Sequence, residues 1–295
     1  MSLDNKAKGI VCGGQFSKST YPCSDCTTPC SDFCTGEKTG DTRTVSHSAY
    51  EYENFMLKGG KRQNAKDNFN VIHLPLFLPT LEEMKNCHIP IRHFCPPSPL
   101  HNKLGITELF HDEMHKIWPT EVDEWVKKAL ARKSDNPKMK FEGNQCNRLL
   151  ESLHVFYDQF GNPKDLGMVP YLNALNSYNE VRKSCFVVSD NIDVDLCRQK
   201  LEKFKIDSLV LIKDYNVSAI NKLHECHVHF LEWIEEFEMG LGYVDEQTGE
   251  SGHQDFMDFC KGRLIEDIDD PRYLECLRKL VVEYGSKHRK SELCI

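Results

Sequence analysis

The chain has 295 residues, of which 40% are hydrophobic and 28% are charged, and its formal net charge is −8. This length and apolar content suffice for one large or two smaller folded domains, which excludes a disordered protein. The acidic balance argues against a chain that coats DNA, because duplex binding depends largely on Lys and Arg that neutralise phosphates. DNA contacts are therefore expected to be local, and the candidates are Lys58 with Lys61 and Arg62, and Lys287–Lys290, with solvated surface as the alternative.

The first third of the sequence shows little helical periodicity. Residues 1–44 are rich in Gly, Ser, Thr and Cys, which predicts a loop held by something other than an apolar core. Residues 71–78 form a short apolar run, and prolines between Pro75 and Pro99 keep the following stretch irregular. We therefore predict that the helical part begins after Pro99.

From Leu100 onward, apolar residues recur three and four positions apart, which is the period of an amphipathic helix. Thr120–Leu130 combines a Thr cap, an acidic first turn and one apolar face, and it is predicted to be a helix. The same pattern predicts helices over residues 104–117, 146–160, 171–181, 194–204, 209–231 and 273–284. The acidic, glycine-containing residues 243–252 predict a turn that enters a helix near Glu250. The fold class is thus mainly α, and α+β overall.

Membrane and disulfide signals are weak. No stretch approaches about eighteen consecutive apolar residues, and residues 1–14 lack the apolar core of a signal peptide. We therefore expect a soluble, intracellular chain without membrane contact. Fourteen cysteines are spread from Cys12 to Cys294. In a long chain without a secretion signal, this number favours reduced thiols, some of them on a metal, over a disulfide scaffold.

The first candidate site is Cys23-x2-Cys26, because a CxxC turn places two thiolates on one side of a tetrahedral zinc ion. Cys30 and Cys34 follow closely, so a local four-cysteine knuckle on an unrelated helical domain is one alternative. A pair of unliganded surface thiols is the other.

The second candidate is a histidine cluster, His224, His227 and His229. Residues five apart on a straight α-helix point about 140° away from each other. His224 and His229 can therefore share a metal only where the helix ends or bends. Packing and surface roles are the alternative for all three.

The third candidate is acidic, with Asp4 near the start and Asp245, Glu246 and Glu250 near the end. Two-metal phosphoryl transfer needs carboxylates from distant positions to converge on divalent cations. Spacing alone does not show such convergence, and surface charges at helix starts are the alternative.

The order of these motifs resembles a known family. Residues 250–256, with Glu246 before them, resemble the segment that carries the last catalytic acid in Transib-like DDE transposases and in the catalytic subunit of the V(D)J recombinase. In that family two histidines five apart precede this Glu. His224 and His229 have the same separation here, and they precede Glu250 by the family's spacing if the intervening turn contains one extra residue. The resemblance spans nearly the whole chain, and residues 96–101 and 141–150 also look like segments of transposase-derived proteins.

The resemblance implies a role for each candidate. Cys23 and Cys26 would bind a structural Zn²⁺ together with the two histidines. Asp4 and Glu250 would be the second and third catalytic carboxylates, which would hold Mg²⁺ only in a complete site. The family's first catalytic Asp lies on a strand upstream of Asp4, and only three residues precede Asp4 here. The chain would then be a remnant of a ribonuclease-H-like core that lacks its first strands, without independent catalysis.

The implied organisation has three parts. Residues 1–70 would be a truncated core segment with the zinc loop, residues 71–205 a proline-rich connector and helical insertion, and residues 206–295 a helical segment with the His pair and Glu250. The resemblance also implies a nuclear protein with weak DNA contact. The alternative function is a zinc-stabilised interaction or regulatory module that binds protein or DNA, with a protein partner or a second copy of the chain.

Overall fold

The computed structural model describes most of the chain, and its helices form two separate compact units. The units are Met1–Asp245 and Glu246–Ile295. The described part is mainly helical and contains isolated β-bridges but no strand, so the predicted mainly helical class is confirmed. The described residues are 5–15, 19–76, 78, 80–130, 141–159, 167–244, 259–265, 270, 272–273, 275–277, 279–280 and 283.

The N-terminal part contains helices that the sequence pattern did not predict. The prediction that the helical part begins only after Pro99 is therefore wrong. Its longest helix, α2 (Val45–Leu57), begins at Thr44, whose side chain accepts a hydrogen bond from the His47 amide. Val45 and Ala49 of α2 pack against buried Met84 in a small core of their own. The other short helices in this region are α1 (Asn5–Cys12), η1 (Cys30–Thr35), η2 (Arg62–Asn68), α3 (Leu81–Lys85) and η3 (Ile91–His93). Three small apolar clusters include residues of α1, α2, α3, η1 and η3, and side-chain caps begin α2 and α3. Neither feature leaves a long periodic pattern in the sequence.

The middle of the chain forms the helices that carry the main core. The predicted helices at 104–117, 120–130, 171–181 and 194–204 lie within α4 (Pro99–Ile117), α5 (Pro119–Leu130), α8 (Val169–Cys185) and α9 (Val194–Asp214). The predicted helix at 146–160 is instead divided into α6 (Gly143–Glu151) and α7 (His154–Gln159). The break occurs at Ser152, where the hydroxyl bonds to the Leu149 carbonyl and accepts the indole N–H of Trp125.

The prediction of one continuous helix over 209–231 is also wrong, because that stretch contains the end of α9, an irregular segment and then α10, a π-helical turn and the start of α11. Helix α9 continues to Asp214, and Asn216 then adopts a left-handed conformation with φ of 57°. Asn is one of the few side chains that tolerate this conformation, so it ends the helix. The chain resumes as α10 (Asn221–His224), passes through a π-helical turn at Glu225–His229, and continues as α11 (Phe230–Phe237).

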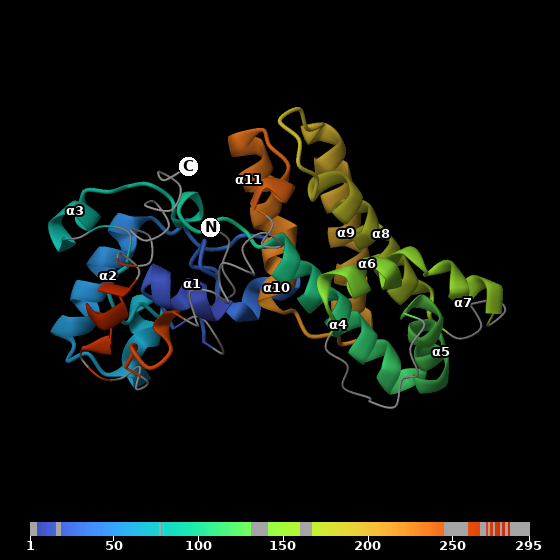
Figure 1. Cartoon of the computed structure of the whole chain (residues 1–295), viewed down its shortest axis with the longest axis horizontal. Coiled ribbons are helices and arrows are strands. Elements are labelled where there is room, and N and C mark those ends of the chain that lie inside the picture. Colours follow the sequence, from blue (N-terminus) through green and yellow to red (C-terminus); the bar gives the residue numbers. More distant parts are fainter. Residues whose placement is uncertain are drawn as a thin grey trace. The chain divides into compact units, whose positions relative to one another are not determined.

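One large apolar cluster holds these helices together. It includes fully buried aromatic side chains from α4, α5, α8, α9 and α11: Phe110, Trp125, Tyr178, Phe204 and Phe230. Each such side chain contributes about 1.5–3 kcal/mol relative to its exposed state. Helices α10 and α11 lie between the α8–α9 pair and the N-terminal helices in Figure 1. The turn at 225–229 thus lies between the N-terminal helices and the helices of the main core.

The second unit is described only in short stretches. Tyr273, Leu277 and Leu280 are buried there, and the described residues between 273 and 283 are helical, as predicted for 273–284. The predicted turn at 243–252 lies almost wholly outside the described residues. Among the described helices, none is long and apolar enough to cross a membrane.

Candidate metal centre

The two cysteines lie in a compact loop between α1 and η1. Both side chains are buried, and the Asp25 amide points at the Cys23 Sγ at 3.4 Å, while the Cys26 Sγ lies 3.2 Å from the Thr28 hydroxyl. Arg43 is fully buried and donates from Nε to the carbonyls of Cys23 and Cys26, both at 3.0 Å. A guanidinium that binds both carbonyls fixes the backbone of the loop and so fixes the direction of the two thiols.

The two histidines flank a widened helical turn. His224 is the last residue of α10, and Glu225–His229 form a π-helical turn in which the Phe230 amide bonds to the Glu225 carbonyl, five residues back. The wider turn puts residues five apart on the same side, whereas a straight α-helix separates them by about 140°. The ring centroids of His224 and His229 are 5.1 Å apart. The condition that the helix must bend for this pair to share a metal is therefore met.

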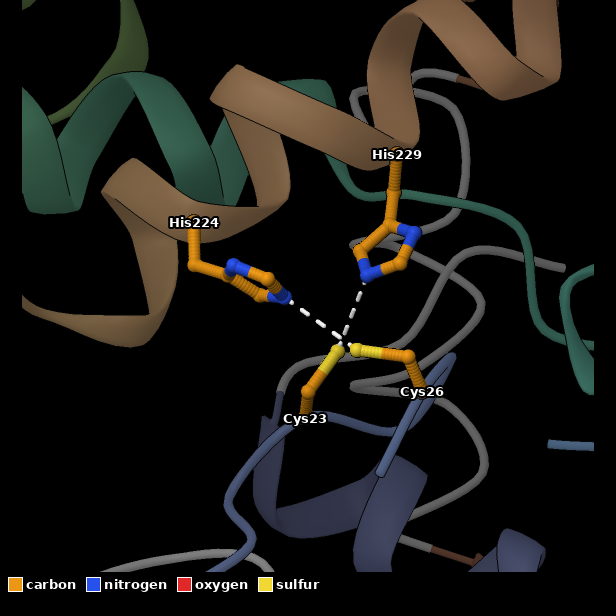
Figure 2. Close-up of side chains that lie close together, drawn as sticks. All are labelled: Cys23, Cys26, His224 and His229. Carbon is orange, nitrogen blue, oxygen red and sulfur yellow. Dashed lines mark hydrogen bonds between the residues drawn. The ribbon is translucent and has the colours of Figure 1, made fainter. Parts of the chain in front are cut away.

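These four side chains converge on one point. The Cys23 Sγ lies 3.2 Å from the His229 Nε2, and the Cys26 Sγ lies 3.2 Å from the His224 Nε2 (Figure 2). All four donor atoms lie within 4.8 Å of one another, and all four residues are buried. A tetrahedral zinc ion, with Zn–S near 2.3 Å and Zn–N near 2.0–2.1 Å, would place S and N about 3.5 Å apart. The cluster can therefore hold a metal ion such as zinc after a separation of a few tenths of an ångström.

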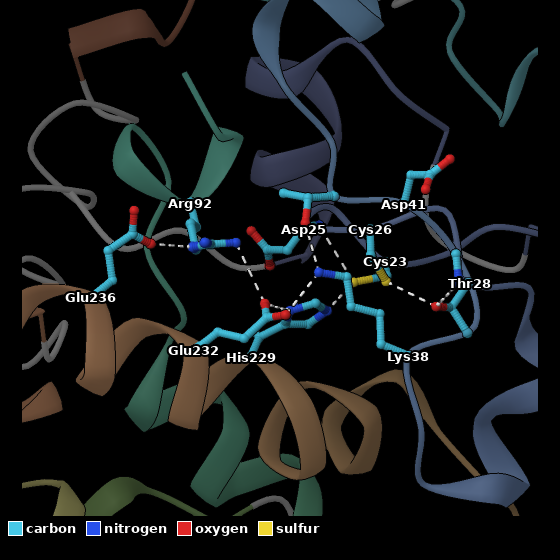
Figure 3. Close-up of polar contacts among 12 residues, drawn as sticks. Cys23, Asp25, Cys26, Thr28, Lys38, Asp41, Arg92, His229, Glu232 and Glu236 are labelled. Atoms are coloured by element: carbon cyan, nitrogen blue, oxygen red, sulfur yellow. Dashed lines mark hydrogen bonds and ion pairs between the residues drawn. The ribbon is translucent and has the colours of Figure 1, made fainter. Parts of the chain in front are cut away.

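A network of charged side chains orients His229 from its other nitrogen. The His229 Nδ1 lies 2.9 Å from the Glu232 carboxylate, which also pairs with Lys38 at 2.7 Å and with Arg92 at 3.4 Å (Figure 3). A carboxylate on Nδ1 fixes the tautomer and leaves Nε2 for a metal. Arg92 extends the network to Glu236 at 2.7 Å. Lys38 and Arg92 come from the N-terminal part, so the network joins that part to α11.

His224 is oriented by packing. Its ring is fully buried and stacks on Phe33 with 4.2 Å between centroids and 8° between planes. Its Nδ1 is buried and has no hydrogen-bond partner among the described residues. Phe33 lies in η1, directly after the cysteine loop. The aromatic contact with Phe33 therefore orients the His224 ring, whereas the Glu232 carboxylate orients the His229 ring.

The electrostatics of the cluster favour transfer of a proton from a thiol to an imidazole. The hydrogen bond from Cys23, with those from the histidines, lowers the pKa of Cys26, whereas burial raises the pKa of Cys23. Burial opposes the protonated form of His229, but the interactions with Cys26 and Glu232 outweigh it and raise its pKa to about 10. A cation that binds Nε2 must displace this proton, so metal binding releases protons.

A buried ion pair adjoins the cluster. The Lys8 ammonium of α1 lies 3.2 Å from the Glu225 carboxylate, and both side chains are at most 4% exposed. Glu225 also accepts from the Asn102 amide at 3.3 Å and the Ser98 backbone amide at 3.4 Å. Burial raises the pKa of the Glu225 carboxyl, but attraction to Lys222 and Lys8 outweighs it and lowers that pKa to about 2. The pair fixes α1 to the π turn that presents the histidines.

The other candidate residues lie elsewhere. His227 bonds through Nε2 to the Ser208 hydroxyl at 2.7 Å, and burial lowers its pKa to about 3. Cys30 and Cys34 are exposed and do not belong to the four-residue group, so a local four-cysteine knuckle gains no support in the described part of the chain. The acidic candidates are all outside the described residues: Asp4, Asp245, Glu246 and Glu250.

Several residues that support the cluster were not singled out from the sequence. Glu232 follows His229 by three positions, one helical turn, so this spacing could have indicated it. Lys8, Lys38 and Arg43 contact residues that are distant in the sequence, so no local sequence pattern indicated their roles.

Comparison with protein-family models and with curated proteins identifies no relative of this chain. No protein-family model matches it, and no curated protein matches it significantly.

Proposed function

We propose that this chain is a transposase-derived, mainly helical protein whose two sequence halves are joined by a structural zinc ion on Cys23, Cys26, His224 and His229. The observation that carries the proposal is the convergence of a CxxC loop and a histidine pair across some two hundred residues. Two thiolates and two imidazoles are a preferred donor set for tetrahedral zinc.

The donor set supports a structural role over a catalytic one. Four protein ligands complete a tetrahedral shell, whereas catalytic zinc keeps one position for water or substrate. All four side chains are buried among the described residues, which is typical of a closed structural site. A closed site of this kind contributes folding free energy, because its ligands are assembled only in the folded chain.

The DDE transposase resemblance supplies the functional part of the proposal. It pairs an upstream CxxC with a downstream histidine pair, which is the pairing that the four side chains make here. On this basis Asp4 and Glu250 belong to a Mg²⁺ site for DNA strand cleavage and transfer, and the helices are the remnant of a ribonuclease-H-like core in a nuclear protein. These 295 residues contain two of the three carboxylates, so we assign them no independent strand cleavage.

The test is zinc stoichiometry by native mass spectrometry on the whole chain. Wild type is expected to hold one zinc, and the His224→Ala, His229→Ala double variant to hold none. A Cys30→Ser, Cys34→Ser variant is the matched control, and it should keep the zinc because both thiols are exposed and outside the group. Zinc retained by the histidine variant and lost by the control would place the ion on the cysteines alone and overturn the proposal.

The catalytic part has its own test. A longer chain that includes a strand with the first carboxylate is expected to cleave DNA with Mg²⁺, and Glu250→Ala should abolish that cleavage. Wild-type cleavage by Glu250→Ala would remove Glu250 from the site and leave the zinc assignment untouched.

A further inference from the structure

Two buried thiols meet where α1 contacts the segment that follows η3. Cys12 is the last residue of α1, and Cys95 lies just after η3 with its amide bonded to the Ile91 carbonyl at 2.9 Å. Cys12, Ile91 and Cys95 form a small apolar cluster, and both thiols are at most 1% exposed. The two thiols hydrogen-bond to each other, so their sulfur atoms are neighbours. Both cysteines are free, and neither belongs to the four-residue metal group.

A buried cation lies beside this thiol pair. Lys8 precedes Cys12 by about one turn of α1, so both side chains lie on the same side of the helix. Burial opposes the charge of Lys8, but attraction to Glu225 outweighs it and raises the Lys8 pKa, so the side chain stays an ammonium. The hydrogen bond from Cys12 lowers the pKa of the Cys95 thiol, burial raises it, and attraction to Lys8 lowers it further. Asp25 acts against Lys8 but less strongly, and the balance favours a thiolate at Cys95.

The chain contains a second buried thiol pair without such an ammonium. Cys185 ends α8, Cys197 lies near the start of α9, and these two thiols also hydrogen-bond to each other. The bond from Cys185 lowers the pKa of Cys197, whereas burial and the Asp193 carboxylate raise it. This pair therefore has the same thiol contact in a different electrostatic setting, and it serves as an internal reference.

We propose that Cys12 and Cys95 are a redox-modification site at which hydrogen peroxide forms a reversible disulfide, with Lys8 as the positioning residue whose charge acts on Cys95. The Cys95 thiolate attacks one peroxide oxygen, the O–O bond breaks, and the leaving hydroxide takes up the proton that Cys95 had released. The Cys12 sulfur then attacks the Cys95 sulfenic acid, the S–O bond breaks, and hydroxide leaves with the Cys12 proton as water. Two thiols are oxidised to one disulfide, and one peroxide is reduced to two waters.

Entry of peroxide requires a local opening of α1. This helix has eight residues. Helices shorter than about 12–15 residues are marginal on their own, so α1 depends on its tertiary contacts and opens at a lower cost than the whole fold. Closure of α1 then returns Cys12 to the oxidised Cys95. The disulfide closes a chain loop that contains the CxxC pair and all of α2, so the oxidised protein should be more stable than the reduced one.

The test is peroxide oxidation of the whole chain, followed by alkylation of the remaining thiols and peptide mass spectrometry. The background carries Cys30→Ser and Cys34→Ser, which remove two exposed thiols. The Cys12–Cys95 disulfide is expected to form at least about tenfold faster than a Cys185–Cys197 disulfide, because the thiolate is the nucleophile. A dithiol reductant should reverse the link, and the Tm should be higher while it is present. Cys12→Ser should abolish both the link and the rise in Tm.

The pH dependence of the oxidation rate tests the role of Lys8. In the wild type the rate should fall as pH falls below the Cys95 pKa, and Lys8→Met should move this fall to higher pH. A purely structural role would change the Tm and leave the pH profile in place. Lys8→Arg keeps the charge and should keep the wild-type profile. The comparison of the two thiol pairs needs no Lys8 variant, so it decides the matter even if Lys8→Met does not fold.

Several results would count against this site. Equal oxidation rates of the two pairs, or a pH profile that Lys8→Met leaves unchanged, would overturn the role of Lys8. Absence of the Cys12–Cys95 link in folded, peroxide-treated protein would overturn the proposal outright, as would a link that forms only after zinc is removed. The inference does not rest on the proposed function. Zinc content measured in parallel separates its failure from failure of the metal-site proposal.

Discussion

Replacement of Glu225 by Gln tests whether the buried ion pair beside the Cys23, Cys26, His224 and His229 cluster joins α1 to the π turn that carries the histidines. Lys8 and Glu225 are separated by 217 positions, and the Lys8 side chain is 1% exposed. Removal of one partner from a buried ion pair costs about 3–5 kcal/mol, because an uncompensated charge stays in a low-dielectric environment. The free energy of unfolding of a typical domain is about 5–15 kcal/mol, so the loss is a large fraction of it.

The structure predicts that replacing Glu225 lowers the free energy of unfolding more than replacing Lys8 does. After Lys8→Met, Glu225 keeps Lys222 at 3.4 Å and the amides of Asn102 and Ser98. After Glu225→Gln, the Lys8 ammonium retains only the longer-range attraction of Asp25 among the carboxylates that act on it. Glu225→Gln should therefore destabilise the protein more than Lys8→Met, and the double variant should recover part of the loss. We expect a coupling energy of about 1–3 kcal/mol.

The assay is urea denaturation of the zinc-loaded protein, followed by circular dichroism, for the wild type, both single variants and the double variant. The reasoning fails if the two single effects add without coupling, or if Glu225→Gln costs less than about 1 kcal/mol. The exposed pair of Lys183 and Glu180, at 3.3 Å, serves as the control, since exposed pairs contribute about 0–1 kcal/mol.

Three further predictions concern the metal centre and the loop after α11. Glu232→Gln should weaken zinc binding about 10–100-fold in chelator competition, because the carboxylate fixes the His229 tautomer. The control variant Glu236→Gln should have little effect on zinc binding. Equal effects of the two variants would argue against a specific role of Glu232. Zinc removal by a chelator should lower the Tm by an amount that re-added zinc restores, and a Tm indifferent to zinc would exclude a structural ion. Gly240→Ala should cost about 2 kcal/mol or more in thermal unfolding, because its Cβ would lie 2.0 Å from the Val187 carbonyl oxygen, and a neutral effect would contradict this packing.

The four side chains of the cluster could be singled out from the sequence, because thiols and imidazoles at these spacings are typical of zinc sites, with packing and surface roles as the alternative. Cys23-x2-Cys26 indicated a metal loop, and the separation of His224 and His229 indicated that a helix would have to deform to use both. The structure shows this deformation as the π turn at Glu225–His229. The pairing itself came from a resemblance, since local patterns do not show which distant motifs meet.

The sequence alone determined the helical class and the main amphipathic helices, because a period of three to four apolar residues follows from the geometry of the helix itself. Tertiary structure decided the rest. The break at Ser152 depends on the indole of Trp125, and α2 and α3 depend on a small core around Met84. The burial of Lys8 depends on Glu225, which lies more than two hundred positions away. Such features arise from contacts between distant residues, whose free energy is absent from any local stretch of the chain.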